Sequence, residues 1–386
     1  MPAGVPTPTT LPADPKVVWH SPVGFGLGSP IVAGGKVFYL DAQAGQETLH
    51  AADAASGREL WSAPVDRTFL DTQSQAGPRG TPMADGDRVY AQSCQGEFQC
   101  RDAQDGKLRW RVNFVKDFGA LFFGEHGAAV GASRHGYTDS PVIDGERILV
   151  GAGGTNGASI VCFDKRNGQV RWKSQNDVPG HSGPVIATLG GVRQAVSFTA
   201  AGVMSVATAD GALLWRVPVK SSIGRHITTP VIVGDMVVVA SHQAGLVGIR
   251  VTPAAEGFKA TTVYADMESA INFSSPVAVG PCLYGVGPAK NLICVDIPSG
   301  KQRWSKEGYF QSAGGRAYAA FIVMGDRILM LTDGGLLVLF AADPSQCREL
   351  SATQVCGNNW CNPAYADGRL YLRDQRELRC VQLLPE

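Results

Sequence analysis

The sequence lacks a net charge and lacks long hydrophobic runs. Its 34 Lys and Arg residues balance its 34 Asp and Glu residues over a chain of 386 residues. Such a chain has no overall electric field that would attract it to nucleic acid or to an acidic membrane surface. The apolar stretch VIVGDMVVVAS is interrupted by Gly234 and Asp235, and it is much shorter than the roughly 20 residues that a membrane-spanning helix needs. We therefore expect no nucleic-acid partner and no membrane span.

Helical periodicity and metal motifs are missing as well. No segment sustains the apolar spacing of an amphipathic helix, and alternating apolar and polar residues with many β-branched side chains favour strands throughout. None of the nine cysteines belongs to a C-x-x-C pair with zinc spacing. The sequence thus predicts an all-β protein without a metal centre.

The chain does contain a repeated phrase. An Asp, a Gly-containing turn and a Trp recur in FDKRNGQVRW, ADAASGRELW, RDAQDGKLRW and VDIPSGKQRW, and a shorter version, ATADGALLW, ends at Trp215. A second phrase consists of a small residue, a Pro and alternating apolar residues, as in SPVIDGERILV from Ser140. It starts eight times, mostly 43 to 59 residues apart, although the seventh start, at Ala319, has lost the Pro. Self-similarity at such a period is typical of repeat architectures.

Each repeat has the pattern of four short strands. In the third repeat, residues 141–144, 147–153, 159–164 and 169–174 are predicted strands, and turns with Gly145 and Gly168 separate them in pairs. Four-stranded units at this spacing are the signature of a β-propeller, whose radial closure protects the sheet edges. We predict eight four-stranded antiparallel blades.

The recurring Trp occupies one place in the repeat, at the start of the fourth strand. A large ring there would lie between neighbouring blades and bury roughly 150–250 Å². The Gly before it permits a tight turn, and the Asp hydrogen-bonds the turn backbone. The predicted blade-docking residues are Trp19, Trp61, Trp110, Trp172, Trp215 and Trp304, and Tyr264 takes this place in the fifth repeat.

The two ends of the series predict how the ring closes. The eighth repeat stops without a fourth strand, whereas KVVWHSPV, from Lys16, is a fourth strand without a repeat. We expect this first strand to complete the last blade, so that residues 16–386 form one propeller. Residues 1–15 are rich in Pro and Thr and are predicted to form a flexible tether. We expect an exported protein, periplasmic or extracellular, whose targeting segment is not present in this chain.

The cysteines leave two pairings open. Cys100, Cys162, Cys294 and Cys380 occupy one equivalent position on four blades, too far apart to bridge one another, and we expect them to be buried as small apolar side chains. Cys94 could pair with Cys100 across a hairpin, and any two of Cys347, Cys356 and Cys361 could form a disulfide.

The D-x-x-x-G-x-x-x-W phrase and segments such as GYTDSPVIDGERILV resemble the PQQ-like β-propeller repeat proteins over nearly the whole chain. That family includes the outer-membrane assembly lipoprotein BamB and the propellers of quinoprotein alcohol dehydrogenases. The dehydrogenases are much longer and place adjacent cysteines against the quinone, and this chain has no Cys-Cys dipeptide. The resemblance therefore implies a BamB-like scaffold that handles a partner, with no bound quinone and no other cofactor.

The loops that lead into the first strand of each blade crowd the mouth of a propeller's central channel. They supply the predicted binding residues Arg79, Tyr137, Asp139, His181, Arg225, His226, Asn272, Arg316, Tyr318 and Trp360, with His135 in the same loop as Tyr137.

Three interpretations of this set stay open. The side chains could form only a solvated rim. They could bind a protein or an anionic, sugar-like ligand, with Arg79, Arg225 and Arg316 as fork donors and with Tyr318 and Trp360 stacking. They also resemble the Arg, His and Tyr set of polysaccharide lyases. We expect a monomeric, non-enzymatic scaffold that binds a protein or glycan at this face, with a lyase-type or other carbohydrate-active enzyme as the alternative.

Overall fold

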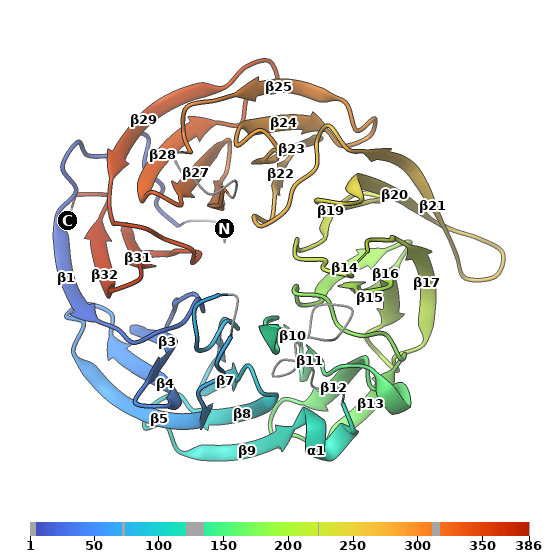
Figure 1. The fold of residues 1–386 in the computed structure, drawn as a ribbon, viewed down its shortest axis with the longest axis horizontal. Helices are drawn as coiled ribbons and strands as arrows, with labels where there is room; N and C mark the ends of the chain where they lie inside the picture. The colour runs from blue at the N-terminus through green and yellow to red at the C-terminus, as the bar shows by residue number, and fades with distance from the viewer. Residues whose placement is uncertain (1–4, 72–73, 121–134, 223, 311–316, 386) are drawn as a thin grey trace.

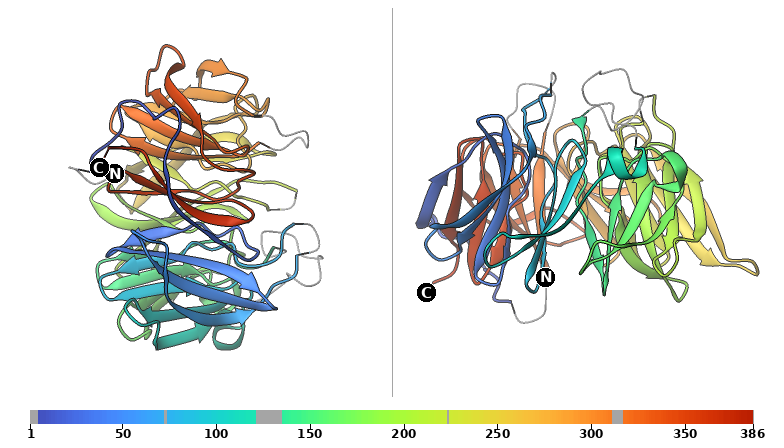
Figure 2. Two further views of the ribbon diagram at one scale, coloured as in Figure 1. Left: turned by 90° about the vertical axis from the view of Figure 1, so that its left-hand side faces the viewer. Right: turned by 90° about the horizontal axis from the view of Figure 1, so that it is seen from below.

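The computed structural model describes residues 5–71, 74–120, 135–222, 224–310 and 317–385. Within these ranges, eight four-stranded antiparallel sheets stand around a central axis as the blades of a propeller (Figures 1 and 2). The predicted all-β, eight-bladed architecture is therefore confirmed.

The first four blades follow one another along the chain, and each runs from an innermost to an outermost strand. Their strands are β2 (Ile31–Ala33), β3 (Lys36–Gln43), β4 (Gln46–Asp53), β5 (Glu59–Arg67); β6 (Met83–Asp85), β7 (Arg88–Gln92), β8 (Glu97–Asp102), β9 (Leu108–Asn113); β10 (Val142–Asp144), β11 (Arg147–Gly151), β12 (Ile160–Asp164), β13 (Val170–Ser174); β14 (Val185–Leu189), β15 (Val192–Thr199), β16 (Gly202–Ala207) and β17 (Leu213–Pro218).

The remaining blades keep the same order. Their strands are β18 (Val231–Val233), β19 (Met236–Ser241), β20 (Gly245–Pro253), β21 (Phe258–Asp266); β22 (Val277–Val279), β23 (Cys282–Val286), β24 (Leu292–Asp296), β25 (Gln302–Lys306); β26 (Ala319–Met324), β27 (Arg327–Thr332), β28 (Leu336–Ala341), β29 (Arg348–Gln354); and β30 (Ala364–Ala366), β31 (Arg369–Arg373), β32 (Glu377–Gln382) with β1 (Val17–Pro22).

The ring closes by strand pairing between the two ends of the chain. β1 pairs antiparallel with β32, with Trp19 opposite Cys380 and His20 opposite Arg379. β1 is thus the outermost strand of the last blade, as the orphan fourth strand in the sequence predicted. Figure 1 shows β1 in blue beside β32 in red.

Each seam between neighbouring blades has its own hydrophobic cluster. One of them combines Tyr90 and Phe98 of the second blade with Ile148 and Phe163 of the third, all with no exposed surface. Because a blade is covered on both flat faces, its middle strands are buried on both sides; β19, for example, is buried at all six positions. The eight clusters together form a ring-shaped core around the axis.

The recurring Trp side chains lie at these seams. The indole N–H of Trp110 donates to the carbonyl of Lys165 in the next blade at 3.2 Å. A Cβ added to Gly168 of that same turn would be 2.6 Å from the Trp110 ring. The repeated Gly therefore serves two needs, because it adopts a φ of 72° and it leaves room for the ring of the preceding blade.

Four further Trp side chains make the same contact, whereas Trp215 does not. Trp19, Trp61, Trp172 and Trp304 donate to Ala54, Ala103, Thr208 and Asp343 of the next blade. Trp215 instead donates to Gln194 of its own blade. At that seam the long hairpin of β20 and β21 brings Pro253 and Phe258 against Gly190 of the neighbouring blade.

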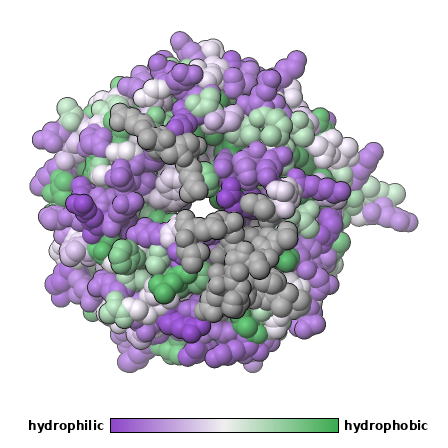
Figure 3. Space-filling model, in the orientation of Figure 1, coloured by the Kyte–Doolittle hydropathy of each residue, from purple (hydrophilic) through white to green (hydrophobic). Residues whose placement is uncertain are grey.

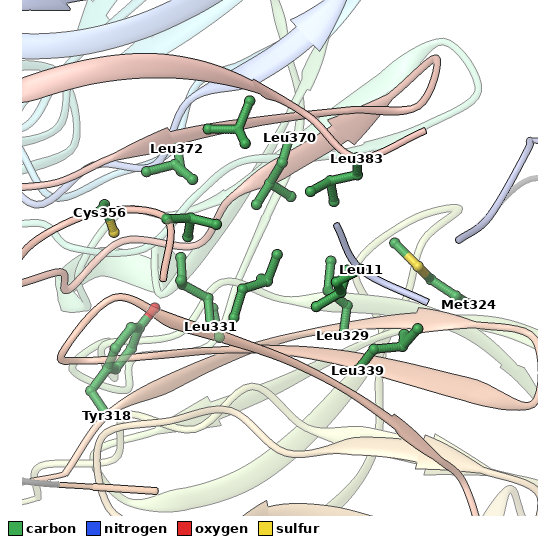
Figure 4. Packing of buried hydrophobic residues seen from close by; sticks show 14 residues of the cluster. Leu11, Tyr318, Met324, Leu329, Leu331, Leu339, Cys356, Leu370, Leu372 and Leu383 are labelled. Carbon is green, nitrogen blue, oxygen red and sulfur yellow. The ribbon is translucent and has the colours of Figure 1, made fainter. Parts of the chain in front are cut away.

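The segment expected to be a tether makes contacts with the last two blades. Leu11 is only 6% exposed and packs among side chains that include Leu339 and Leu370 (Figure 4). Its backbone N–H donates to Ser351, and the hydroxyl of Thr353 donates to the carbonyl of Ala13. The described part of this segment, from residue 5 on, is thus laid against the seam between these blades despite its composition.

Two smaller features depart from the sequence-based expectation. A one-turn helix, α1 (Phe114–Phe118), follows β9 and packs its two Phe side chains into the core. All nine cysteines are free thiols, so the structure contains neither of the two disulfides that the spacing left open. Cys100, Cys162, Cys294 and Cys380 are fully buried.

Candidate functional site

Antiparallel blades sort their connections onto two faces of the disc. In each blade, the turns between the first and second strands and between the third and fourth strands lie on one face, here called the turn face. The turns between the second and third strands, and the loops into the next blade, lie on the opposite, mouth face. In the space-filling view an opening is visible at the centre of the ring (Figure 3).

The mouth face holds a pocket of about 720 Å³ at the channel opening. Six of the ten predicted binding residues line it: Arg79, Asp139, His181, Arg225, Tyr318 and Trp360. They come from loops that are far apart in sequence, and the ring brings these loops together. His135 also lines the pocket.

The other four predicted residues are placed differently. Tyr137 is 5% exposed, and its hydroxyl donates to the carbonyl of Ala152 at 3.1 Å. His226 is fully buried and stacks on Phe198 at 4.1 Å. Asn272 is half-buried and does not line the pocket. Arg316 lies outside the described residues.

One wall of the pocket carries cationic and imidazole groups. Arg79 Nη2 donates to Asp71 Oδ2 at 2.8 Å, and His135 Nδ1 donates to the same carboxylate oxygen. These side chains are only 11%, 3% and 17% exposed in the order Arg79, Asp71, His135. The Nε–H of Arg79 is buried and has no hydrogen-bond partner among the described residues. This wall therefore contains a buried donor that a ligand could bind.

His181 continues this wall. Its Nδ1 shares a 2.8 Å hydrogen bond with the hydroxyl of Thr138. Its ring centre lies 5.6 Å from that of His135. Two imidazoles and Arg79 therefore stand side by side on loops that lead into the second, third and fourth blades.

The opposite wall is aromatic. Trp360 stacks on Tyr318 with ring centres 5.0 Å apart and meets Phe273 edge to face at 5.7 Å. The guanidinium of Arg225 lies 5.6 Å from the Phe273 ring centre. Tyr318 is held by its hydroxyl, which donates to Asn362 at 3.1 Å. This wall offers a ring face for stacking with a cation at its edge.

A buried carboxyl and a belt of hydroxyl groups lie between the walls. Asp139 accepts from Gln92 Nε2 at 2.6 Å and from Gly151 N at 3.2 Å, and burial raises its pKa to about 6. The belt consists of the small residues that start most blades: Ser29, Thr81, Ser140, Thr229 and Ser275. Several of their hydroxyls accept a backbone N–H from a neighbouring blade, as Ser140 does from Thr81 at 3.0 Å.

Sequence reasoning missed Asp71, Thr138 and Phe273. Phe273 stands beside the predicted Asn272, and Thr138 between the predicted Tyr137 and Asp139, so both belong to loops from which binding residues were predicted. Asp71 had no such signal, because it lies eight residues before Arg79 and approaches His135 only across the folded loops.

The lyase alternative needs a His, a Tyr and an Arg that face one another. Among the described residues this triple is not assembled. The hydroxyls of Tyr137 and Tyr318 are engaged with Ala152 and Asn362. Both ring nitrogens of His226 are engaged, with the carbonyl of Thr199 and the hydroxyl of Ser221, and burial lowers the pKa of this imidazole.

Metal and membrane features were searched over the same residues. No three or more His, Cys, Asp or Glu side chains of the described ranges gather closely enough to hold a metal ion. No helix in these ranges combines the length and the apolar character needed to cross a bilayer.

Comparison with known proteins gives the family. Residues 45–306 match the sequence model of the family described as outer membrane protein assembly factor BamB. BamB of Shewanella oneidensis is 22% identical over 343 residues, which cover 81% of this chain and 76% of that protein. The crystal structure of BamB from Moraxella catarrhalis superposes with a TM-score of 0.63 at 15% identity, covering 96% of this chain and 100% of the other.

A second group of relatives is enzymatic. The dehydrogenase subunit of a quinone-type alcohol dehydrogenase from Komagataeibacter europaeus is 30% identical over 172 residues. The match covers 41% of this chain and only 21% of the length of that subunit. Since the family model spans more than half of the sequence, the chain belongs to the PQQ-like, BamB-type propeller family.

Proposed function

We propose that this BamB-type propeller is a binding protein rather than an enzyme, and that its mouth pocket takes a ligand with an anionic group and a ring face, such as an acidic sugar within a glycan. We further propose that it acts as a monomer in the periplasm or outside the cell. The location and the non-enzymatic role draw support from the family description, and the ligand class draws support from the site.

The observation that carries the proposal is the pairing of two chemically different walls around one pocket of about 720 Å³. Pockets of roughly 300–1,000 Å³ are the usual size for small-molecule sites. Arg79, His135 and His181 form one wall, and Phe273, Tyr318 and Trp360 form the other. A ligand that spans them needs a negative charge at one end and a flat or apolar face at the other.

The charged wall suits an oxyanion for a physical reason. Arg79 is largely desolvated, and its Nε–H has no partner among the described residues. A carboxylate or sulfate that accepts from this donor would satisfy a buried polar group. Because the donor is buried, this charge-assisted hydrogen bond would be stronger than an exposed one. The neighbouring hydroxyl belt supplies further donors and acceptors for the hydroxyl groups of a sugar.

The test uses matched sugars and matched variants. We expect D-galacturonate to raise the melting temperature of the protein and D-galactose, which lacks the carboxylate, to have little effect. A ligand at 100 times its Kd adds about 2.7 kcal/mol of stability. Arg79→Gln and Trp360→Leu should each weaken binding roughly tenfold or more, whereas Arg250→Gln, whose side chain lies at blade five beside Asp235, should leave it unchanged.

Two outcomes would contradict the proposal. Equal shifts with galactose and galacturonate would remove the role of the charged wall. Silence with galacturonate and with sulfated sugars would remove the small-ligand role altogether.

A specific observation favours a protein partner as the second candidate. Phe25 and Leu70, with exposed fractions of 61% and 73%, lie at a recess of about 530 Å³ that shares Gln375 with the mouth pocket. Exposed apolar side chains beside a recess are typical of protein interfaces. A photo-crosslinker in place of Leu70 should then give a product of defined mass, and one in place of Val192, on the turn face, should not.

A further inference from the structure

A cluster of ionisable side chains that does not line the mouth pocket lies in the first blade. Asp41 of β3 is fully buried, and His50 of β4 lies between it and Glu59 of β5. His50 Nε2 is 3.0 Å from Asp41 Oδ1, and His50 Nδ1 is 2.8 Å from Glu59 Oε2. The side chain of His50 is only 10% exposed, whereas that of Glu59 is 54% exposed.

The geometry of this cluster requires a charged imidazole. Both ring nitrogens face carboxylate oxygens, and a neutral imidazole carries only one N–H. Only the imidazolium can donate to Asp41 and Glu59 at once. Tyr39 stacks parallel to the ring, with centres 4.8 Å apart, and covers its flat face.

Asp41 connects this imidazolium to the segment that closes the ring. Its second oxygen accepts from the backbone N–H of Gly24 at 2.7 Å and from Gln43 at 2.9 Å. Gly24 lies just after β1, where the chain leaves the last blade and enters the first. A Cβ at this position would be 2.3 Å from the carbonyl of Ala42, so the close approach depends on glycine.

A side chain of the last blade forms hydrogen bonds with the same segment from the other side. Arg373 of β31 is 1% exposed, and it donates to the carbonyl of Gly24 at 2.7 Å and to that of Leu40 in β3 at 2.6 Å. A continuous hydrogen-bonded chain thus runs from Glu59 through His50, Asp41 and Gly24 to Arg373. This chain of hydrogen bonds joins the first blade to the last blade. In the last blade, β1 is held beside β32 by strand pairing, with no covalent link between the two strands.

We propose that protonated His50 fastens the closing strand β1, so that the ring closure of this propeller is sensitive to pH. The groups that face the imidazole are Tyr39 and Asp41 from β3 and Glu59 from β5, with Arg373 of β31 behind Asp41. When His50 loses its proton, one of the two carboxylate contacts loses its donor, and two anionic groups remain beside a neutral ring. The grip of Asp41 on Gly24 then weakens.

The direction of the pH effect follows from linkage. Burial alone would lower the pKa of His50, but the hydrogen bonds and charges of Asp41 and Glu59 outweigh it and raise this pKa above its usual 6.5. A group with a raised folded-state pKa contributes its full stabilisation below the unfolded value and loses it as the pH rises through the folded value. Closure should therefore loosen as the pH rises above the usual pKa of histidine, 6.5.

Hydrogen exchange of the intact protein tests this at the level of single strands. Between pH 6 and pH 9, after division by the intrinsic exchange rate, we expect the protection of residues 17–25 to fall roughly tenfold relative to β19 across the ring. In His50→Gln this protection should be low at every pH, because the neutral amide donates to only one carboxylate. In Glu59→Gln the protection should be lost at a lower pH than in the unchanged protein.

A second histidine supplies the matched control. His20 Nδ1 lies 3.3 Å from Glu377 across the same β1–β32 pair, with an exposed side chain. His20→Gln should keep the pH dependence. The proposal is overturned if β1 and β19 respond to pH alike, or if His20→Gln and not His50→Gln removes the response. Should His50→Gln fail to fold, an unchanged loss of protection in Glu59→Gln would overturn it equally.

Discussion

The two faces of the disc are built from the same repeat, but the contacts on one face are regular and those on the other face vary from blade to blade. On the turn face, Trp19, Trp61, Trp110, Trp172 and Trp304 make nearly the same contact with the following blade. On the mouth face, the corresponding loops carry Arg79, His181, Phe273 and Trp360, each in a different environment. The repeated contacts hold the ring, and the loops that escape the repeat are free to form a site. The five repeated Trp side chains therefore join neighbouring blades, whereas Trp360 lines the mouth pocket.

The largest expected effect is on the free energy of unfolding, and it compares a Trp between two blades with the Trp at the mouth. Trp110→Ala should lower the free energy of unfolding by about 3–5 kcal/mol, because it empties a seam between two blades. Trp360→Ala removes a half-buried ring at the mouth and should lower it by only about 1–2 kcal/mol. Chemical denaturation followed by circular dichroism measures both. Equal losses would mean that the mouth aromatics are part of the frame.

The glycines of the turn face sharpen the comparison at a smaller scale. Gly168→Ala combines a φ of 72° with a contact of 2.6 Å to the Trp110 ring, and it should lower the free energy of unfolding by about 2–3 kcal/mol. Gly257→Ala has a φ of 81° but no atom within 4 Å of the new Cβ, so only backbone strain of about 1 kcal/mol remains. The same denaturation experiment compares them, and a Gly168→Ala variant no less stable than Gly257→Ala would contradict the docking role.

The smallest effect concerns the mouth and rests on the proposed anionic ligand. The pKa of Asp139 is raised to about 6 by burial, so the carboxyl is mainly neutral at pH 5 and mainly charged at pH 7.5. The affinity for galacturonate should fall over this range by roughly five- to tenfold, about 1 kcal/mol, because the new charge repels the anion. Calorimetric titration measures it. In Asp139→Asn the fall should be smaller, and an identical fall would assign the dependence to other groups.

The sequence predicted the frame far better than the site. The four strands of the third repeat and the pairing of residues near Lys16 with the last blade were predicted because alternation and turn chemistry are local and recur in every repeat. The loops into the blades supply six predicted residues that line the mouth pocket. Within them, however, Tyr137 and His226 turn away from the pocket and bury their polar groups. A loop sequence gives the position of a residue along the channel rim and carries no information about the direction of its side chain.

Composition also gives no indication of the contacts that the N-terminal segment makes. Pro and Thr predict weak local structure, but Leu11 packs in the hydrophobic cluster between the last two blades and Ala13 accepts a hydrogen bond from Thr353. These partners are more than 300 residues away in the sequence, so no local pattern indicates them.

The amino-acid sequence by itself determined the four-stranded form of each blade, the number of blades and the completion of the last blade by the first strand. Each of these depends on patterns within a single repeat or on counting repeats. Only the tertiary structure decided which polar groups meet. Asp71 with His135 and Phe273 with Trp360 depend on how the closed ring sets loops from different blades against one another. His50 lies between two carboxylates because β3, β4 and β5 pair side by side in the first blade. A linear pattern does not encode these distances.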